Sequence, residues 1–121
     1  MAEHSEATEI LREMWARIDA RDWDGLGGLL DPGLVVQYTQ TGETFDSAGF
    51  VRVNREYPGR WYVTVEDVVG DGERAVCRAR VTDGQQTYHV ASFAIVRGGR
   101  ITDMVEVWSE SGQEPPPGRR S

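Results

Sequence analysis

The chain has 121 residues, the usual size of a single domain, and is too short to build two hydrophobic cores. Its 13 basic residues are all Arg and are outnumbered by 20 acidic residues, which gives a net charge of −7. This charge disfavours binding to nucleic acid or to an anionic membrane surface, and it favours uncharged or cationic partners.

Missing residue types exclude several kinds of chemistry. Without Lys, no Schiff base or pyridoxal phosphate attachment through lysine can form. Cys77 is the one cysteine, and His4 and His89 are the only histidines, so an intrachain disulfide and a cysteine-based zinc or iron–sulfur site are excluded. We therefore expect a protein without a metal or a cofactor.

The sequence indicates neither a membrane span nor a signal peptide. Its longest apolar run, Val90 to Val96, is far shorter than the ~20 residues that cross a bilayer. The N-terminus lacks a basic segment followed by an apolar one. We expect a cytoplasmic protein.

Two helices are predicted at the start of the chain. The first begins at Ser5 as N-cap, and apolar residues recur at helical spacing from Ile10 to Ile18. Asp22 caps a second, short helix that extends to Leu30, where Asp31-Pro32-Gly33 ends it.

A short strand at 34–39 and a third helix follow. The helix begins at Asp46 or Ser47 and ends at Tyr57, because the residue before Pro58 avoids the helical conformation.

The second half of the chain alternates β-branched and polar residues. Four strands are predicted, at Trp61 to Val69, Arg74 to Thr82, Gln86 to Val96 and Ile101 to Ser109, joined at Asp71-Gly72, Asp83-Gly84 and Gly98-Gly99. Helices followed by a meander predict an α+β domain with a curved antiparallel sheet over helices. The proline-rich and arginine-rich tail at 113–121 is expected to be flexible and outside the core.

If the last two of these turns contain two residues each, alternation assigns the meander side chains to two faces. One face is small or β-branched: Ala75, Cys77, Ala79, Val81, Val90, Ser92, Ala94, Val96, Ile101, Val105 and Val107. The other is mixed: Arg78, Arg80, His89, Phe93, Met104, Glu106 and Trp108. Because one helical layer covers only one face, we predict that the mixed face looks toward the helices and the small-residue face forms a homodimer. A half-exposed small-residue face is the alternative.

The mixed face carries the candidate chemistry. The assumed register places Arg78, His89 and Trp108 in one row, with Glu106 diagonal to His89. His89 and Glu106 are candidate catalytic residues for proton transfer, and Arg78 is a candidate to hold an anionic or carbonyl oxygen. A buried Arg78–Glu106 ion pair beside a structural His89 is the alternative.

Further residues are candidate contacts for a small-molecule ligand. Trp108 offers an apolar wall, together with Trp15 and Met14 of the first helix, for which a core role is the alternative. Gln37 and Tyr38 alternate on the strand at 34–39, so one of them points inward, and the sequence leaves open which one.

Three stretches of the sequence form a familiar pattern: the segment 16–26, the segment 54–59, and Glu106-Val107-Trp108 before a proline-rich tail. In these stretches, and over residues 6 to 112, the chain resembles the SnoaL-like branch of the nuclear transport factor 2-like superfamily. It implies a single domain at 1–112 with a cone-shaped, cystatin-like fold, a pocket enclosed by a curved sheet, and commonly a sheet-mediated homodimer.

The same superfamily includes ketosteroid isomerases, polyketide cyclases, limonene-epoxide hydrolases, dehydratases and non-catalytic binding domains. At the positions of the isomerase tyrosine, base and second acid, an ungapped comparison places Met14, Gln37 and Ala91. None of the three matches, so the resemblance does not imply ketosteroid isomerase activity.

Three functions remain open. The first is a cofactor-free isomerase, cyclase, hydratase or hydrolase that acts on a mainly apolar, oxygen-bearing metabolite. The second is a pocket that binds such a metabolite without transforming it. The third is an interaction domain whose pocket is filled by its own aromatic side chains.

Overall fold

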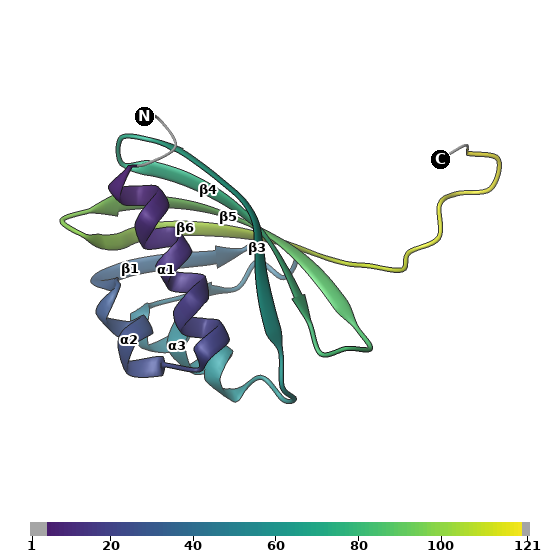
Figure 1. Cartoon of the computed structure of the whole chain (residues 1–121), viewed down its shortest axis with the longest axis horizontal. Coiled ribbons are helices and arrows are strands. Elements are labelled where there is room, and N and C mark those ends of the chain that lie inside the picture. Colours follow the sequence, from purple (N-terminus) through teal and green to yellow (C-terminus); the bar gives the residue numbers. More distant parts are fainter. Residues whose placement is uncertain (1–4, 120–121) are drawn as a thin grey trace.

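The computed structural model describes residues 5–119 as three helices and a six-stranded sheet, which confirms the α+β fold class. The helices are α1 (Glu6–Ala20), α2 (Trp23–Gly28) and α3 (Ser47–Glu56). The strands are β1 (Leu30–Tyr38), β2 (Thr44–Phe45), β3 (Tyr62–Asp71), β4 (Arg74–Thr82), β5 (Thr87–Arg97) and β6 (Arg100–Glu110). Figure 1 shows the sheet curving behind α1, with α2 and α3 near the C-terminal end of α1 and the segment after β6 leading away from the sheet.

The strand order is β2-β1-β6-β5-β4-β3, so the last strand of the chain lies inside the sheet, between β1 and β5. Strands β3 to β6 form the predicted antiparallel meander, whereas β1 pairs with β6 in parallel. A parallel pair requires a crossover between its strands, and here β2, α3 and strands β3 to β5 lie between β1 and β6 in the chain.

The predicted helix starts are confirmed in atomic detail. Ser5 accepts a hydrogen bond from the Thr8 backbone N–H at 3.2 Å, and the Thr8 hydroxyl accepts one from the Ser5 N–H at 3.0 Å. Asp22 caps α2, and Asp46 rather than Ser47 caps α3 through a 2.7 Å hydrogen bond to the Gly49 N–H. Each side chain satisfies a backbone donor that the first helical turn leaves without a partner.

The second helix is shorter than predicted. It ends at Gly28, and Leu30 already belongs to β1, where it pairs with Ile101 of β6. Asp31-Pro32-Gly33 therefore lies within a strand and does not terminate a helix. Pairing with a distant strand here outweighs the local helical pattern, and such pairing has no signal in the local sequence.

Of the two turns that were assumed to contain two residues, one is confirmed and the other is longer. Arg97 pairs with Arg100 across Gly98-Gly99, as expected. Thr82 pairs with Thr87, so the other turn contains four residues, 83–86, instead of two. Its first residue, Asp83, accepts hydrogen bonds from two later backbone N–H groups of the loop at 2.8 Å each. The predicted pairing register of β4 and β5 is therefore shifted by two residues, and a shift by an even number leaves side chains of the two strands on the same faces relative to each other.

A β-bulge in β6 moves the side chains that follow it in the strand to the other face of the sheet. Val96 pairs with Ile101, but Ile95 pairs with Asp103, so Thr102 is an extra residue in β6. A shift of one residue sends every following side chain to the opposite face. Met104 therefore shares a face with Ile101 instead of lying opposite it.

The predicted assignment of the two faces is wrong as a consequence. The small-residue face of β4 and β5 contacts the helices, since Ala75, Cys77 and Ala79 are at most 2% exposed within the single chain. It is joined there by Met104, Glu106 and Trp108, whereas Val105 and Val107 lie on the opposite, outer face. The small-residue face is therefore not available as a dimer interface.

A close contact between α1 and β3 fixes the helix on the sheet. A Cβ atom added to Gly70 would lie 2.6 Å from Cγ2 of Thr8 and 2.7 Å from the carbonyl oxygen of Arg74. Only a residue without a side chain fits at this point. Within residues 5–119, no helix is both long enough and apolar enough to span a membrane.

Candidate functional site

An aromatic cavity of about 450 Å³ lies between α1, α3 and the helix-facing side of the sheet. Aromatic side chains make up the largest group of its lining: Trp15, Trp23, Tyr38, Tyr57, Trp61, Tyr88 and Trp108. The aliphatic part consists of Ile18, Val53, Val63 and Val81, and the polar part of Arg21, Gln40, Glu43, Asn54, Ser109 and Glu110. A cavity of this size, with apolar walls and few polar groups, has the features of a small-molecule site.

Trp108 lies at the centre of the aromatic lining. Its ring centroid is 6.2 Å from Trp15, 6.2 Å from Tyr38 and 6.3 Å from Tyr88, with interplanar angles of 70°, 57° and 75°. Trp61 extends the cluster, 5.6 Å from Tyr88. Inclined rings at these distances pack edge to face, which is a favourable arrangement for aromatic pairs.

A buried carboxyl group holds Trp108 in place. Glu106 is fully buried, accepts a hydrogen bond from the Trp108 indole N–H at 3.1 Å on Oε1, and accepts one from the Ser92 hydroxyl at 2.8 Å on Oε2. Burial raises the pKa of Glu106 to about 7, although both hydrogen bonds act in the opposite direction. Both the neutral and the ionised forms are therefore populated near neutral pH.

Glu106 belongs to a row of polar side chains that crosses the inner face of the sheet. Cys77 pairs with Ser92, Ser92 with Glu106, and Glu106 with Tyr38 of β1. Burial raises the pKa of Cys77 to about 12 and also raises that of Tyr38, and the Glu106 carboxylate contributes to both increases. Cys77 and Tyr38 therefore stay protonated at neutral pH, and Glu106 is the one member of the row that titrates near it.

Four predicted site residues lie at the cavity or next to it. Trp15, Tyr38 and Trp108 line the cavity, and Glu106 lies behind Trp108. Of Gln37 and Tyr38 on β1, Tyr38 is the residue that points inward, whereas Gln37 is exposed on the other face.

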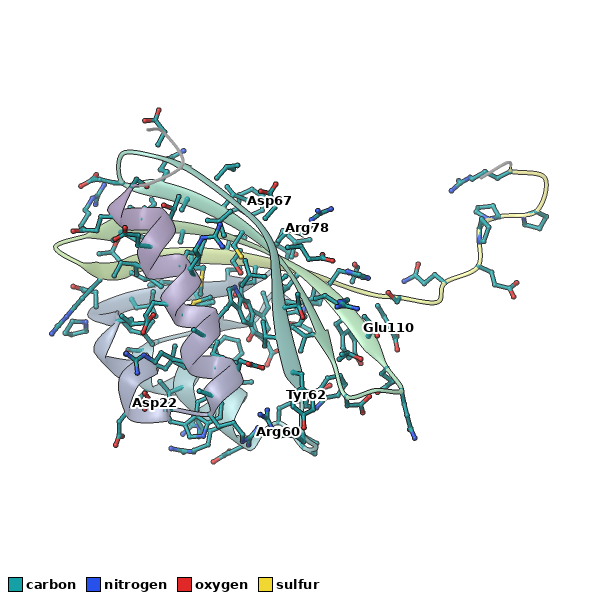
Figure 2. All side chains as sticks on the ribbon, viewed as in Figure 1. Asp22, Arg60, Tyr62, Asp67, Arg78 and Glu110 are labelled. Carbon is teal, nitrogen blue, oxygen red and sulfur yellow. The ribbon has the colours of Figure 1, made fainter. Side chains whose placement is uncertain are left out.

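The predicted row of Arg78, His89 and Trp108 is wrong. Arg78 and His89 both lie on the outer face of the sheet. The Arg78 side chain is 66% exposed there, and its Nε is 3.8 Å from Oε1 of Glu66. Figure 2 shows Arg78 beside Asp67 of the adjacent strand, away from α1. The alternative of an Arg78–Glu106 ion pair is excluded as well, because the two side chains lie on opposite faces of the sheet.

His89 and Met14 lie outside the cavity for different reasons. Nε2 of His89 is 2.6 Å from the Ser111 hydroxyl near the end of β6, on the outer face of the sheet. Met14 is completely buried in the core and does not line the cavity. Ala91, the residue at the position of the isomerase second acid, shares the outer face with His89 and lies outside the cavity.

Several cavity residues, among them Tyr57, Trp61 and Tyr88, were not predicted from the sequence. Tyr88 precedes Val90 and Ser92 by even numbers of residues, so strand alternation would have placed it on the inner face once that face was known. Tyr57 and Trp61 lie on either side of Pro58-Gly59 and reach the cavity through the turn that follows α3. No periodic pattern indicates their contribution.

Within the described part of the chain, no three His, Cys, Asp or Glu side chains gather in a way that could hold a metal ion. The polar residues that line the cavity come from separate segments of the chain: the end of α1, the loop between β1 and β2, α3, and the end of β6.

Solved structures with the same fold are numerous. A provisionally named ketosteroid isomerase from Kribbella flavida is 28% identical, with a TM-score of 0.87 over 98% of this chain and 88% of that one. An NTF-2-like protein of unknown function from Burkholderia xenovorans is 19% identical, with a TM-score of 0.78 over 98% and 92%. IdmH from Streptomyces antibioticus, provisionally a polyketide cyclase, is 18% identical, with a TM-score of 0.76 over 88% and 93%.

Among proteins with curated descriptions, none matches this sequence. The model of the SnoaL-like domain family matches residues 11–104, which include most of α1, all of α2 and α3, strands β1 to β5 and the first part of β6. The architecture agrees with this match, because the curved sheet and N-terminal helices are those of nuclear transport factor 2-like proteins. The chain therefore belongs to the SnoaL-like domain family.

Proposed function

We propose that this protein binds a mainly apolar small molecule in the aromatic cavity between α1, α3 and the sheet. The observation that carries the proposal is the cavity itself, about 450 Å³ in volume and lined by seven aromatic side chains. This volume is within the range of ligand sites in proteins. It argues against a domain whose pocket is filled by its own aromatic residues.

A residue of the cavity lining also has a buried polar group without a partner. The indole N–H of Trp15 is buried and lacks a hydrogen-bond partner among residues 5–119. A buried donor without a partner costs free energy, and an oxygen atom of a ligand that reached this N–H would recover part of that cost. This supports a ligand with an oxygen function on an apolar body.

Binding can be tested by filling the cavity. Val53 lines it from α3, and a Val53→Trp variant would occupy part of the space. We expect this variant to lose affinity for para-tert-butylphenol, measured by isothermal titration calorimetry. Ala48→Trp, at an exposed position of the same helix, is the matched control and is expected to bind as the wild type does. Equal affinity in all three proteins would refute the proposal.

A second function, acid–base catalysis, is favoured by one observation. Glu106 has a pKa of about 7, which suits a group that takes up and releases a proton at neutral pH. Its oxygen atoms are engaged by Ser92 and Trp108, so the Trp108 indole has to shift before Glu106 can contact a ligand. In this function Glu106 exchanges a proton with the carbon next to a carbonyl group.

Deuterium exchange tests this second function without knowledge of the natural substrate. We expect the wild type to accelerate exchange next to the carbonyl group of para-tert-butylcyclohexanone in heavy water, followed by NMR spectroscopy. Glu106→Gln should abolish the acceleration, since an amide neither accepts nor releases a proton readily near neutral pH. His89→Ala is the control and should exchange at the wild-type rate, because His89 lies on the outer face. Exchange by the wild type at the uncatalysed rate would contradict catalysis of this kind.

We further propose a homodimer that uses the outer face of the sheet. This face exposes large apolar side chains in its centre, where Phe93 is 48%, Val105 36% and Val107 44% exposed. Such a cluster on neighbouring strands is typical of an interaction surface. In a two-fold dimer, the same cluster would face its own copy.

A further inference from the structure

We propose that the ligand of the cavity is an organic cation, an amine or a quaternary ammonium group on an apolar body. This inference rests on the proposed binding function and adds the sign of the ligand charge. It is supported by the inclination of the aromatic rings, by carboxylates on two sides of the cavity, and by the position of Arg21.

The aromatic rings enclose the cavity from several directions. The planes of Trp15, Tyr38 and Tyr88 are inclined to that of Trp108 by between 57° and 75°, so the four rings do not form one flat platform. Each ring face carries a partial negative charge, which attracts a cation within about 6 Å of the ring centroid. Several inclined rings around one space form the kind of cage that recognises ammonium groups.

Carboxylates lie on two sides of this cage. Glu43 and Glu110 both line the cavity, Glu43 just before β2 and Glu110 at the end of β6. The charge of Glu43 contributes to raising the pKa of Tyr38, and that of Glu110 contributes to raising the pKa of Tyr88. Tyr38 and Tyr88 belong to β1 and β5, the two strands beside β6, so the two carboxylates lie on different sides of Trp108. Figure 2 shows Glu110 where the chain leaves the sheet. Both groups are exposed, so they attract a cation toward the cavity without being buried themselves.

Among the described residues, Arg21 is the one basic side chain that lines the cavity. Its guanidinium carbon lies 5.3 Å from the centroid of the Trp23 ring, so it already makes a cation–π contact with the protein. With Glu43 and Glu110, the lining has two negative charges and one positive charge. The ionised form of Glu106 adds a third negative charge behind Trp108. An anionic ligand would therefore enter a cavity of unfavourable potential.

Three probes of similar shape separate charge from size. They are para-hydroxyphenyltrimethylammonium, para-tert-butylphenol and para-hydroxybenzenesulfonate, which place a cationic, a neutral and an anionic group on the same phenol. Calorimetric titration of the wild type at low ionic strength should give about tenfold tighter binding of the cation than of the neutral probe. The difference should decrease with added salt, because salt screens the exposed carboxylates.

The other outcomes overturn the inference in distinguishable ways. If the neutral probe binds as tightly as the cation, the cavity binds small molecules but does not select a cation. If the sulfonate binds most tightly, Arg21 dominates the site and the ligand is an anion. If none of the three binds at millimolar concentration, both this inference and the proposed binding function are refuted.

Charge-neutral variants test the contribution of the carboxylates. Replacing both acids, in Glu43→Gln/Glu110→Gln, should weaken binding of the cation by about twofold to fivefold for each carboxylate and leave the neutral probe unaffected. Glu66→Gln is the control for each single carboxylate, because it removes one negative charge from a residue that pairs with Arg78 away from the cavity. An equal loss of both probes in the double variant would indicate altered structure and would contradict electrostatic selection.

Discussion

The buried carboxyl group of Glu106 makes the stability of the fold dependent on pH. Folding raises its pKa from 4.5 to about 7, because the ionised form loses its hydration inside the sheet. Between these two pH values, the folded state binds the proton more tightly than the unfolded state does. The free energy of unfolding should therefore decrease as the pH rises from about 4.5 to about 7, and this contribution should then level off.

The size of the effect follows from the change in pKa. At about 1.4 kcal/mol per pH unit, the raised pKa of Glu106 corresponds to about 3 kcal/mol of stability lost above pH 7. Glu106→Gln removes the titrating group and keeps its shape. The amide oxygen can still accept from Trp108, and the amide nitrogen can donate to Ser92. We expect the variant to gain about 3 kcal/mol relative to the wild type between pH 4.5 and pH 8.

Urea unfolding at several pH values, followed by tryptophan fluorescence, measures this difference directly. All other titrating groups contribute equally to both proteins, so they cancel when the variant is compared with the wild type. Glu110→Gln serves as a control, because it makes the same substitution at an exposed position of the same strand. A stability difference that varied by less than about 1 kcal/mol over this range would refute the reasoning.

Three further predictions concern packing, capping and assembly. Gly70→Ala should lower the free energy of unfolding by about 1–3 kcal/mol, because its Cβ would collide with Thr8. Gly27→Ala should not lower it, because a Cβ added there meets no atom within 4 Å. Urea denaturation measures both variants. Replacing the N-cap of α3, in Asp46→Ala, should cost about 1 kcal/mol in the same assay, and an unchanged midpoint would contradict its capping role. Val107→Arg should leave the protein folded but convert the proposed dimer to monomers in sedimentation velocity experiments, and a persistent dimer would exclude this face as its interface.

Local signals in the sequence are sufficient for most of the fold. The caps at Ser5 and Asp46 act within one helical turn, and Gly98-Gly99 defines its turn without help from the rest of the molecule. Each of these features depends on residues that are neighbours in the chain. The extension of β1 to Leu30 depends on β6, about seventy residues later, and no local pattern reports it.

The candidate site was harder to predict because one bulge decides its composition. Thr102 is an ordinary strand residue in the sequence, and no Gly or Pro marks it as the extra residue of β6. Without the bulge, Glu106 and Trp108 share a face with His89, as predicted. With it, they join Val90 and Ser92 at the inner face. The sequence therefore indicates the right chemical groups on β6 but the wrong neighbours for them.

The central position of β6 also determines the order in which the molecule can be completed. The β3–β4 and β4–β5 hairpins join segments that are close in the chain and can pair as soon as they are available. Strand β1 has only the two-residue β2 as a neighbour until β6, the last strand to be synthesised, inserts beside it. Contacts between distant segments form slowly, because closing a long loop costs entropy before any contact is gained. Trp108 and Glu106 belong to β6, so the cavity cannot be complete before this strand is in place.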